Sequence, residues 1–417
     1  MKRLIFLSFI FISFGAFAQN ELTLEQCYEL VNTNYPLAKQ NDIFSKKNKL
    51  DASVIQKSKL PTLELAGQAT YQSEVTHVPI DNPAISIAPP NKDQYKTTLS
   101  VNQLIYGGAV NTRLEVQNNE LKTQQKQLEV SLYQLKKQVN QLYFSILLMQ
   151  EKGKLLEANK NMLAAKLKEL KAGIEFGVIK SSAINVLKVE VLKIDQRIVE
   201  VNQNKKSLMI TLSQLIGSDV SATTILKNPA ITTKLDEEIT RPELALFQLQ
   251  KQQIETSEQL LTKKNGPKLF GFATGGYGNP GLNMLDNTFQ PYYYVGLKFN
   301  WNLFDWNITQ KQRMSLAVNK EMIDNQQELF KLNTNIELTR QQAEIDKIAE
   351  LVNSDKTIIE LRKKIVASSD SELKNGAITP SAYTTELTHL FEAENNLKTH
   401  EIQLLLAKAN YKTIKGN

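Results

Sequence analysis

The sequence predicts a mainly α-helical chain with a small β part, built as a tandem structural repeat. Three observations predict this class: a long internal repeat, proline-free stretches with a heptad pattern, and short segments with a two-residue period. The repeat is visible in Pro36, Pro61 and Tyr71, which return 206 residues later as Pro242, Pro267 and Tyr277, and in Gly177 and Ala183, which return 199 residues later as Gly376 and Ala382. A repeat of this length is a duplicated structural unit rather than a short solenoid repeat.

The chain opens with a predicted signal peptide. Two basic residues precede an apolar run over residues 4–14, and Ala16-Phe17-Ala18 follows. This order predicts a secretory signal peptide over residues 1–18, with cleavage after Ala18. The apolar run of 11 residues is too short for a spanning helix, which needs about 20. Cys27, the only cysteine, lies beyond the cleavage site, so we expect neither an N-terminal lipid anchor nor an intramolecular disulfide, and we place Cys27 on a helix face.

Four short segments predict β-strands at about residues 62–71, 95–103, 268–277 and 292–301. Their apolar residues alternate with polar ones, although Phe270 and Phe272 break the parity of the third segment. This alternation is typical of a membrane β-barrel, and a small soluble sheet packed on helices would also show it. Four strands cannot close a barrel, and an open sheet in lipid leaves backbone groups unpaired. Strands that span a membrane would therefore require several chains in one barrel.

Two proline-free stretches predict long helices, because proline breaks a helix interior. No proline falls between Pro90 and Pro229 or between Pro291 and Pro380. Apolar residues recur at every seventh position in both stretches, which is the pattern of a left-handed coiled coil. The rows are Leu114, Leu121, Leu128, Leu135, Leu142, Met149, Leu156, Leu163 and Leu170; Leu187, Ile194, Val201, Leu208 and Leu215; Leu338, Ile345, Val352, Ile359, Val366 and Leu373; and Tyr383, Leu390, Leu397, Leu404 and Tyr411.

Glycine-containing turns divide each long stretch into a helical hairpin. Glycine supplies the helix stops, and Pro380 suits the start of a returning helix. We expect repeat 1 at residues 19–217, a linker at 218–240 and repeat 2 at 241–417. The long helix, the turn at the hairpin tip and the returning helix are predicted at 107–172, 173–180 and 181–216 in repeat 1, and at 306–374, 375–380 and 381–414 in repeat 2.

The composition gives little support for nucleic-acid binding or catalysis. The formal charge of +7 falls to +5 without the signal peptide, and Lys and Glu alternate throughout, which indicates solvated helix faces. The three histidines are His77, His389 and His400, and no metal-ligand, phosphate-loop or nucleophile-elbow pattern occurs. We therefore expect no enzyme, no cofactor, no metal site and no nucleic-acid partner.

Short motifs occur in a fixed order and spacing in both copies. They are Leu22-Thr23-Leu24, Asn34-Tyr35-Pro36-Leu37, Leu60-Pro61-Thr62-Leu63, Leu104-Ile105-Tyr106-Gly107-Gly108 and Gly177-Val178-Ile179 in the first, and Arg241-Pro242-Glu243-Leu244, Leu303-Phe304-Asp305-Trp306 and Gly376-Ala377-Ile378 in the second. No single motif is specific. Together they cover essentially all of the mature sequence and resemble the TolC family of outer-membrane efflux proteins, the outer membrane factors.

The resemblance implies a homotrimer in which three chains form a 12-stranded barrel in outer-membrane lipid, continued by an α-helical tunnel in the periplasm. It implies an outer-membrane channel of a tripartite efflux or type I secretion system. Such a channel is a passive exit duct for substrates that an inner-membrane pump of the RND or ABC type delivers through a periplasmic adaptor (membrane fusion) protein. The linker at 218–240 would belong to an equatorial belt around the tunnel.

The resemblance also assigns candidate site residues. The adaptor-facing tip would comprise Gly177, Val178, Ile179, Ser182, Gly376, Ala377, Ile378 and Ser381. Asp370 and Glu372, just before the second turn, are candidates for a tunnel constriction, although from the sequence alone they are ordinary surface acids. Two other functions stay open: an exported coiled-coil scaffold without a pore, and a sealed assembly that acts as a receptor or an envelope tether.

Overall fold

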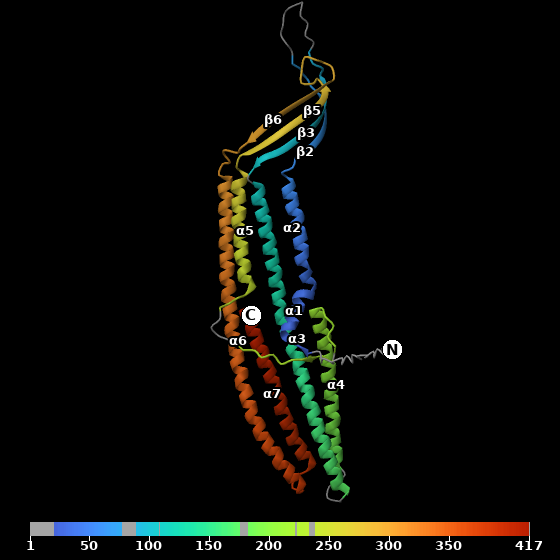
Figure 1. Cartoon of the computed structure of the whole chain (residues 1–417). Helices are drawn as coiled ribbons and strands as arrows, with labels where there is room; N and C mark the ends of the chain where they lie inside the picture. Colours follow the sequence, from blue (N-terminus) through green and yellow to red (C-terminus); the bar gives the residue numbers. More distant parts are fainter. Residues whose placement is uncertain are drawn as a thin grey trace, which may run out of the picture. The chain divides into compact units, whose positions relative to one another are not determined.

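The structure is a computed structural model that describes residues 21–76, 89–107, 109–175, 182–221, 223–232 and 238–416. The predicted signal peptide and Gly177, Val178 and Ile179 of the first turn lie outside these residues. The helices are α1 Leu24–Asn34, α2 Gln40–Lys57, α3 Ala109–Glu175, α4 Ser182–Ile216, α5 Pro242–Lys264, α6 Ile308–Lys374 and α7 Pro380–Lys415, with a short 3-10 helix at Pro36–Lys39. The strands are β1 Glu21–Leu22, β2 Thr62–Tyr71, β3 Asp93–Gly107, β4 Ile225–Leu226, β5 Lys268–Asn279 and β6 Gln290–Asn300 (Figure 1).

Local sequence signals explain where several helices begin. Thr23 and Gln26 form a capping box at the start of α1: the Thr23 hydroxyl accepts from the Gln26 N–H, and the Gln26 side chain accepts from the Thr23 N–H at 2.8 Å. Pro242 and Pro380 occupy the first positions of α5 and α7, where a missing N–H costs nothing. Thr379 caps α7, because its hydroxyl accepts from the Ala382 N–H.

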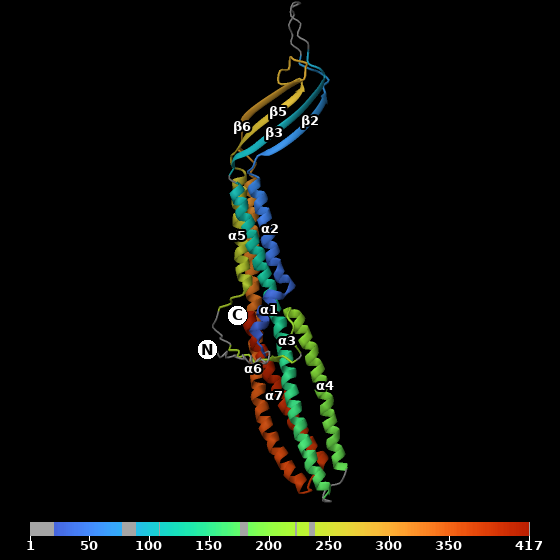
Figure 2. The same ribbon diagram turned by 45° about the vertical axis from the view of Figure 1, so that its right-hand side comes forward.

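The chain divides into two compact units, and each repeat contributes to both. One unit combines residues 40–130 and 242–330 and holds the four-stranded sheet. Its strands lie in the order β2-β3-β5-β6, and every neighbouring pair is antiparallel (Figures 1 and 2). The two central strands, β3 and β5, come from different repeats, so the sheet joins the two copies.

The other unit combines the described residues of 1–39, 131–241 and 331–417 and holds the hairpins α3–α4 and α6–α7. From Leu135 onward, the predicted heptad rows lie in this unit, and many of their members belong to its cores. Leu156, Leu163 and Leu170 of α3 are buried with Leu187 and Ile194 of α4. The second-copy rows supply further buried residues, namely Ile345, Val352, Ile359, Leu373, Tyr383, Leu390 and Tyr411. The coiled-coil prediction is therefore confirmed by burial of the rows.

A separate core in the same unit surrounds α1. Cys27, Tyr143 and Leu212 are completely buried there, beside Leu226 of β4. The two-residue strands β1 and β4 pair in parallel, and the Gln150 side chain both donates to the Leu226 carbonyl and accepts from its N–H. The expected linker is thus bound to the helices over part of its length.

Several boundaries differ from those expected. Strand β3 runs on to Gly107 because a bulge between Leu104 and Tyr106 lets pairing with β5 continue past the expected end. The prediction that the first turn begins at residue 173 is wrong, since α3 continues to Glu175. Glycine inside a helix costs only about 1 kcal/mol relative to alanine, so Gly173 does not stop α3.

Candidate functional site

The register of the sheet sorts its side chains into two faces. Successive residues of a strand point to opposite faces, and paired residues share one. The apolar face carries Leu63, Leu65, Ala69 and Tyr71 of β2, Tyr95, Leu99 and Val101 of β3, Ala273 and Tyr277 of β5, and Tyr293, Val295, Leu297 and Phe299 of β6. The polar face carries Glu64, Gln68 and Thr70; Lys96, Thr98, Ser100 and Asn102; Lys268 and Thr274; and Lys298 and Asn300, together with Leu104, Phe270, Phe272, Tyr292 and Tyr294.

The apolar face is uncovered in a single chain. Leu65, Val295 and Leu297 are 74%, 71% and 69% exposed. In the described part of the chain, no strand pairs with the outer edge of β2 or of β6. An apolar surface of this extent is rare on a soluble monomer, and two open edges are sites for pairing with another chain.

Two helices also carry exposed apolar rows at heptad spacing. Leu351, Ile358 and Ile365 recur at every seventh residue on α6, and Val189, Leu192 and Val199 follow one another at intervals of three and seven residues on α4. The α6 row is separate from the buried row that packs against α7, so α6 has a second apolar stripe. Exposed apolar stripes on a long helix indicate contact with a further helix.

The second hairpin turn is described in full. Gly376 has a φ of +70°, a left-handed conformation that glycine adopts without strain, and its N–H donates to the Leu373 carbonyl at 3.1 Å. The N–H of Ala377 donates to the Glu372 carbonyl at 2.8 Å. Gly376 and Ala377 are exposed, whereas Ile378 packs against the core formed by all four helices of the hairpins. Ser381 lies exposed in the first turn of α7.

Ser182 is the first residue of α4. The ends of α3 and α4 lie beside those of α6 and α7 (Figures 1 and 2), and the buried contacts among Leu170, Leu187 and Leu373 hold these ends together. The structure therefore brings the second turn close to the helices that flank the first.

Asp370 belongs to a cluster of charges that links the two hairpins. Its carboxylate accepts from Lys166 of α3 and, at 2.8 Å, from Lys374 of α6. Lys166 also donates to Glu169 at 3.0 Å, and its ammonium lies 5.2 Å from the centre of the Tyr383 ring. Lys166 is nearly buried, with a side chain only 6% exposed.

Electrostatic interactions within this cluster keep Asp370 and Lys166 charged. Burial alone would raise the pKa of Asp370, but hydrogen bonds from Lys166 and Lys374 and the charges of these lysines outweigh it and lower that pKa. Burial would likewise lower the pKa of Lys166, and its bonds to Asp370 and Glu169 raise it instead. Glu372 differs, because it is exposed and accepts only from Ser368, one turn earlier on α6.

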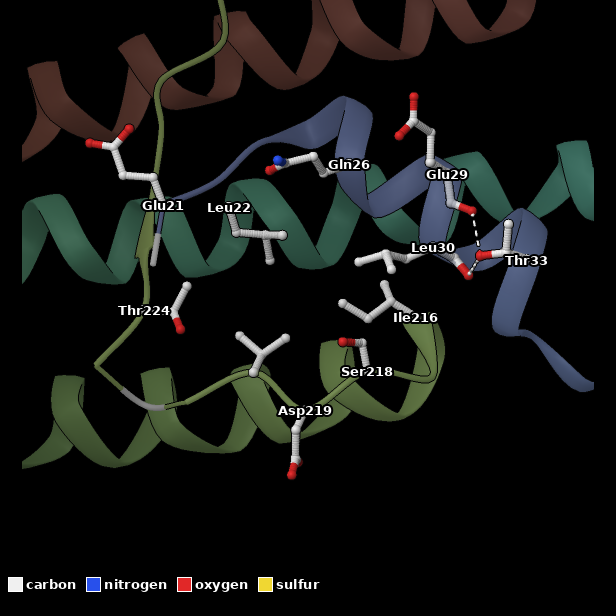
Figure 3. Close-up of a pocket in the computed structure, with 11 residues that line it drawn as sticks. Glu21, Leu22, Gln26, Glu29, Leu30, Thr33, Ile216, Ser218, Asp219 and Thr224 are labelled. Atoms are coloured by element: carbon white, nitrogen blue, oxygen red, sulfur yellow. Dashed lines mark hydrogen bonds between the residues drawn. The ribbon is translucent and has the colours of Figure 1, made fainter. Parts of the chain in front are cut away.

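A hollow of about 450 Å³ lies beside α1, between this helix and the segment that follows α4. Leu22, Leu30 and Ile216 point into it, whereas the carboxylates of Glu21 and Asp219 point away from its centre (Figure 3). The Thr33 hydroxyl on its wall donates to carbonyl groups of its own helix. The hollow is therefore lined mainly by apolar surface, and the residues described around it include no histidine or cysteine.

The remaining reactive side chains have structural roles. Burial, with a smaller effect of Glu25, raises the pKa of Cys27 to about 12, so its thiol stays protonated. His400 bonds Asp355 at 2.6 Å across the α6–α7 pair. Within the described residues there is no group of three or more His, Cys, Asp or Glu side chains that could hold a metal ion. Nor does any helix in the described ranges have an apolar stretch long enough to cross a membrane.

The geometry defines a class of protein. Its sheet has one apolar face, one polar face and two unpaired edges, so it needs strands from other chains, and its long helices form hairpins with glycine-containing turns. Residues 48–218, most of the first repeat, match the model of the outer membrane efflux protein family. No curated protein sequence matches the chain.

Solved structures extend the similarity to both repeats. CusC, described as forming a transmembrane channel, matches with a TM-score of 0.66 at 11% identity over 94% of this chain and 92% of its own. The outer membrane protein VceC from Vibrio cholerae matches with a TM-score of 0.63 at 13% identity over 94% and 96%. The MtrE outer membrane channel of Neisseria gonorrhoeae matches with a TM-score of 0.63 at 12% identity over 94% and 89%.

The chain is thus similar to the outer membrane efflux protein family in sequence over residues 48–218, and in fold to these solved outer membrane proteins over 94% of its length. The resemblance to the TolC family that the sequence indicated is confirmed.

Proposed function

We propose that the chain is the outer-membrane channel of a tripartite efflux or type I secretion system. It acts as a passive exit duct, and the energy for transport comes from an inner-membrane pump. The observation that carries this proposal is the sheet, which has one exposed apolar face, one polar face and two unpaired edges.

The edges of the sheet make three copies a natural assembly. Backbone groups in lipid must be paired, so an open sheet cannot lie in a membrane alone. Each neighbouring pair from β2 to β6 is antiparallel, and therefore β2 and β6 run in opposite directions. Strand β6 of one copy can then continue the antiparallel pattern on β2 of the next. Three copies give about twelve strands, enough to enclose a water-filled pore with the apolar face toward lipid.

The helices continue the duct into the periplasm. In a homotrimer, the exposed rows on α4 and α6 face helices of the neighbouring chains and lose contact with water, which favours assembly by the hydrophobic effect. The resulting wall of hairpins encloses a tunnel. The channel lies in the outer membrane and its helical part lies in the periplasm, a location that also requires the export signal expected at residues 1–18.

The hairpin turns form the adaptor-facing tip in this proposal. Gly376 and Ala377 present exposed backbone on a tight turn, and Ile378 fixes that turn to the core. By their positions in the repeat, Gly177, Val178, Ile179 and Ser182 of the first copy and Ser381 of the second are assigned to the same tip. A periplasmic adaptor binds these turns and connects the channel to the pump.

Asp370 and Glu372 have different parts in the proposed constriction. Asp370 clamps α6 to α3 through Lys166, so it holds the hairpin ends together. Glu372 is exposed and supplies the free negative charge, three copies of which meet around the axis of a trimer. Replacing Asp370 loosens the clamp and opens the tip.

Single-channel recording of the purified full-length protein in planar lipid bilayers tests the proposal. Wild type or Asp370→Asn should give discrete conductance steps, with larger or more frequent openings in Asp370→Asn. A three-chain particle in which neither protein conducts would contradict the duct and favour a sealed tether. A protein released from cells without detergent would favour the coiled-coil scaffold.

A further inference from the structure

Four aromatic side chains lie on the polar face of the sheet, where the alternation of the sequence leads one to expect polar residues. Phe270 and Phe272 of β5 and Tyr292 and Tyr294 of β6 share this face, because Phe272 pairs with Gly296, Thr274 with Tyr294, and Gly276 with Tyr292. We call these four residues the aromatic shelf. On the same face of β3, Asn102 pairs with Phe272 and Leu104 with Phe270, and the residues that follow along the face, Ser100 and Thr98, are polar.

Glycines make room for two of these rings. A Cβ atom on Gly276 would lie 2.4 Å from the Tyr292 ring, and one on Gly296 would lie 2.9 Å from the Phe272 ring. The outer end of each ring therefore lies against the backbone of its cross-strand partner, in space that the side chain of any other residue would fill. Phe272 and Tyr294 meet edge to face, with ring centres 6.0 Å apart and an angle of 69° between the planes.

The shelf remains open to solvent in the chain. Tyr294 is 46% exposed, and the other three side chains are partly exposed. The charged groups on this face are one acid, Glu64 of β2, and three lysines, Lys96 of β3, Lys268 of β5 and Lys298 of β6, of which Lys298 pairs with Phe270. The shelf is thus an apolar surface of four aromatic rings in a polar setting whose charged groups are mainly positive.

We propose that the aromatic shelf binds planar aromatic solutes by stacking, so that such solutes are held on their way through the pore. This inference rests on the proposed function, which places the polar face toward the water-filled interior. Rings prefer offset-stacked and edge-to-face contacts with other rings, and stacking on exposed tyrosine and phenylalanine is tolerant of the chemical identity of the ring. Three copies of the shelf would surround one pore.

Stabilisation of the sheet alone would also account for rings that cover glycines. Tyr294 separates this explanation from binding, because its cross-strand partner is Thr274 rather than a glycine. Removing the Tyr294 ring leaves both glycine-covering rings, Tyr292 and Phe272, in place. Tyr293 supplies a matched control: it is the adjacent tyrosine on the same strand, is 79% exposed, and lies on the apolar face.

The test uses the assembled full-length protein in lipid nanodiscs, with riboflavin as the probe. Riboflavin carries a planar three-ring system on a polar ribityl chain, and stacking on tyrosine quenches its fluorescence. Ribitol, the same chain without the rings, is the control ligand, and empty nanodiscs correct for binding to lipid. Wild type, Tyr294→Ser and Tyr293→Ser are titrated, particle mass is measured on the same samples, and conductance is measured on the same proteins in planar lipid bilayers.

Wild type should quench riboflavin saturably, and ribitol should not compete. Tyr294→Ser should weaken binding by about 2- to 12-fold, the range expected for one aromatic contact, and Tyr293→Ser should bind like wild type. Absence of quenching beyond empty nanodiscs, an unchanged affinity in Tyr294→Ser, or an equal loss in Tyr293→Ser would overturn the shelf. A conducting three-chain particle without riboflavin binding overturns the shelf alone, whereas absence of such a particle overturns the proposed function.

Discussion

The charge cluster at the hairpin ends gives a prediction that can be worked out from the structure. Asp370→Asn removes the carboxylate that accepts from both Lys166 and Lys374. Lys166 is 6% exposed and keeps one partner, Glu169 at 3.0 Å. Breaking a fully buried ion pair costs about 3–5 kcal/mol, and an exposed pair contributes at most about 1 kcal/mol. Because Asp370 is 28% exposed and Lys166 keeps Glu169, we expect a loss of about 1–2 kcal/mol.

The assay is urea unfolding of the extracted particle, followed by the helical circular dichroism signal at one fixed protein concentration, since assembly contributes to stability. Asp346→Asn, at an exposed position of the same helix, is the matched control and should cost less than about 0.5 kcal/mol. Lys166→Met removes the buried ammonium, leaves Asp370 with Lys374, and should cost less than Asp370→Asn.

The pH dependence follows from the lowered pKa of Asp370. A carboxyl whose pKa is lower in the folded state contributes stability that is present above its ordinary value of 3.8 and is lost as the pH falls through the folded value. The stability difference between wild type and Asp370→Asn should therefore be constant between about pH 5 and 8 and shrink below about pH 4. Equal stability of Asp370→Asn and Asp346→Asn, or a difference that grows in acid, would refute the reasoning.

Three further predictions concern the sheet and the helix ends. Val295→Lys places a charge at the middle of the apolar face and should destabilise the inserted protein by about 2–4 kcal/mol, which lowers the amount in the outer-membrane fraction. Thr379→Ala removes the cap of α7 and should cost about 1 kcal/mol in urea unfolding. Gly217→Ala should cost about 2 kcal/mol in the same assay, because Gly217 has a φ of +61° and an added Cβ would lie 2.8 Å from that of Asn34.

Each of these variants has a control in the chain. Thr98→Lys, on the polar face, should reach the outer membrane like wild type, and equal loss of both lysine variants would argue against opposite environments for the two faces. Thr379→Ser keeps the capping oxygen and should restore stability. Gly153→Ala lies in a helix with only one contact near an added Cβ, at 3.9 Å, so it should not destabilise; a similar cost at Gly153 and Gly217 would contradict the steric argument.

The helical part of the fold could be predicted because heptad rows are local in sequence. The seven-residue spacing of Leu156, Leu163 and Leu170 is enough to predict the buried face of the helix, and these residues are buried in the structure. The strand β4 could not be foreseen in this way. Two residues carry no period, and β4 is defined by its pairing with β1, about 200 residues earlier, and by the bonds of the Gln150 side chain to Leu226.

The candidate site depends on pairings between residues that are distant in sequence. Asp370 and Glu372 cannot be distinguished in the sequence. The contact with Lys166 of α3 shows that Asp370 is held in an ion pair, whereas Glu372 is exposed. The sequence shows that Phe270 and Phe272 interrupt the alternation of apolar and polar residues, but it does not show what these two rings contact. Phe272 could be placed opposite Gly296 only once the register of β5 and β6 was known.

The mass of the particle extracted from the outer membrane in mild detergent tests the central claim most directly, because the sheet of one chain has two open edges. We predict a discrete particle of three chains that needs detergent for its release. A monomer, or protein recovered without detergent, would contradict the shared barrel and with it the channel.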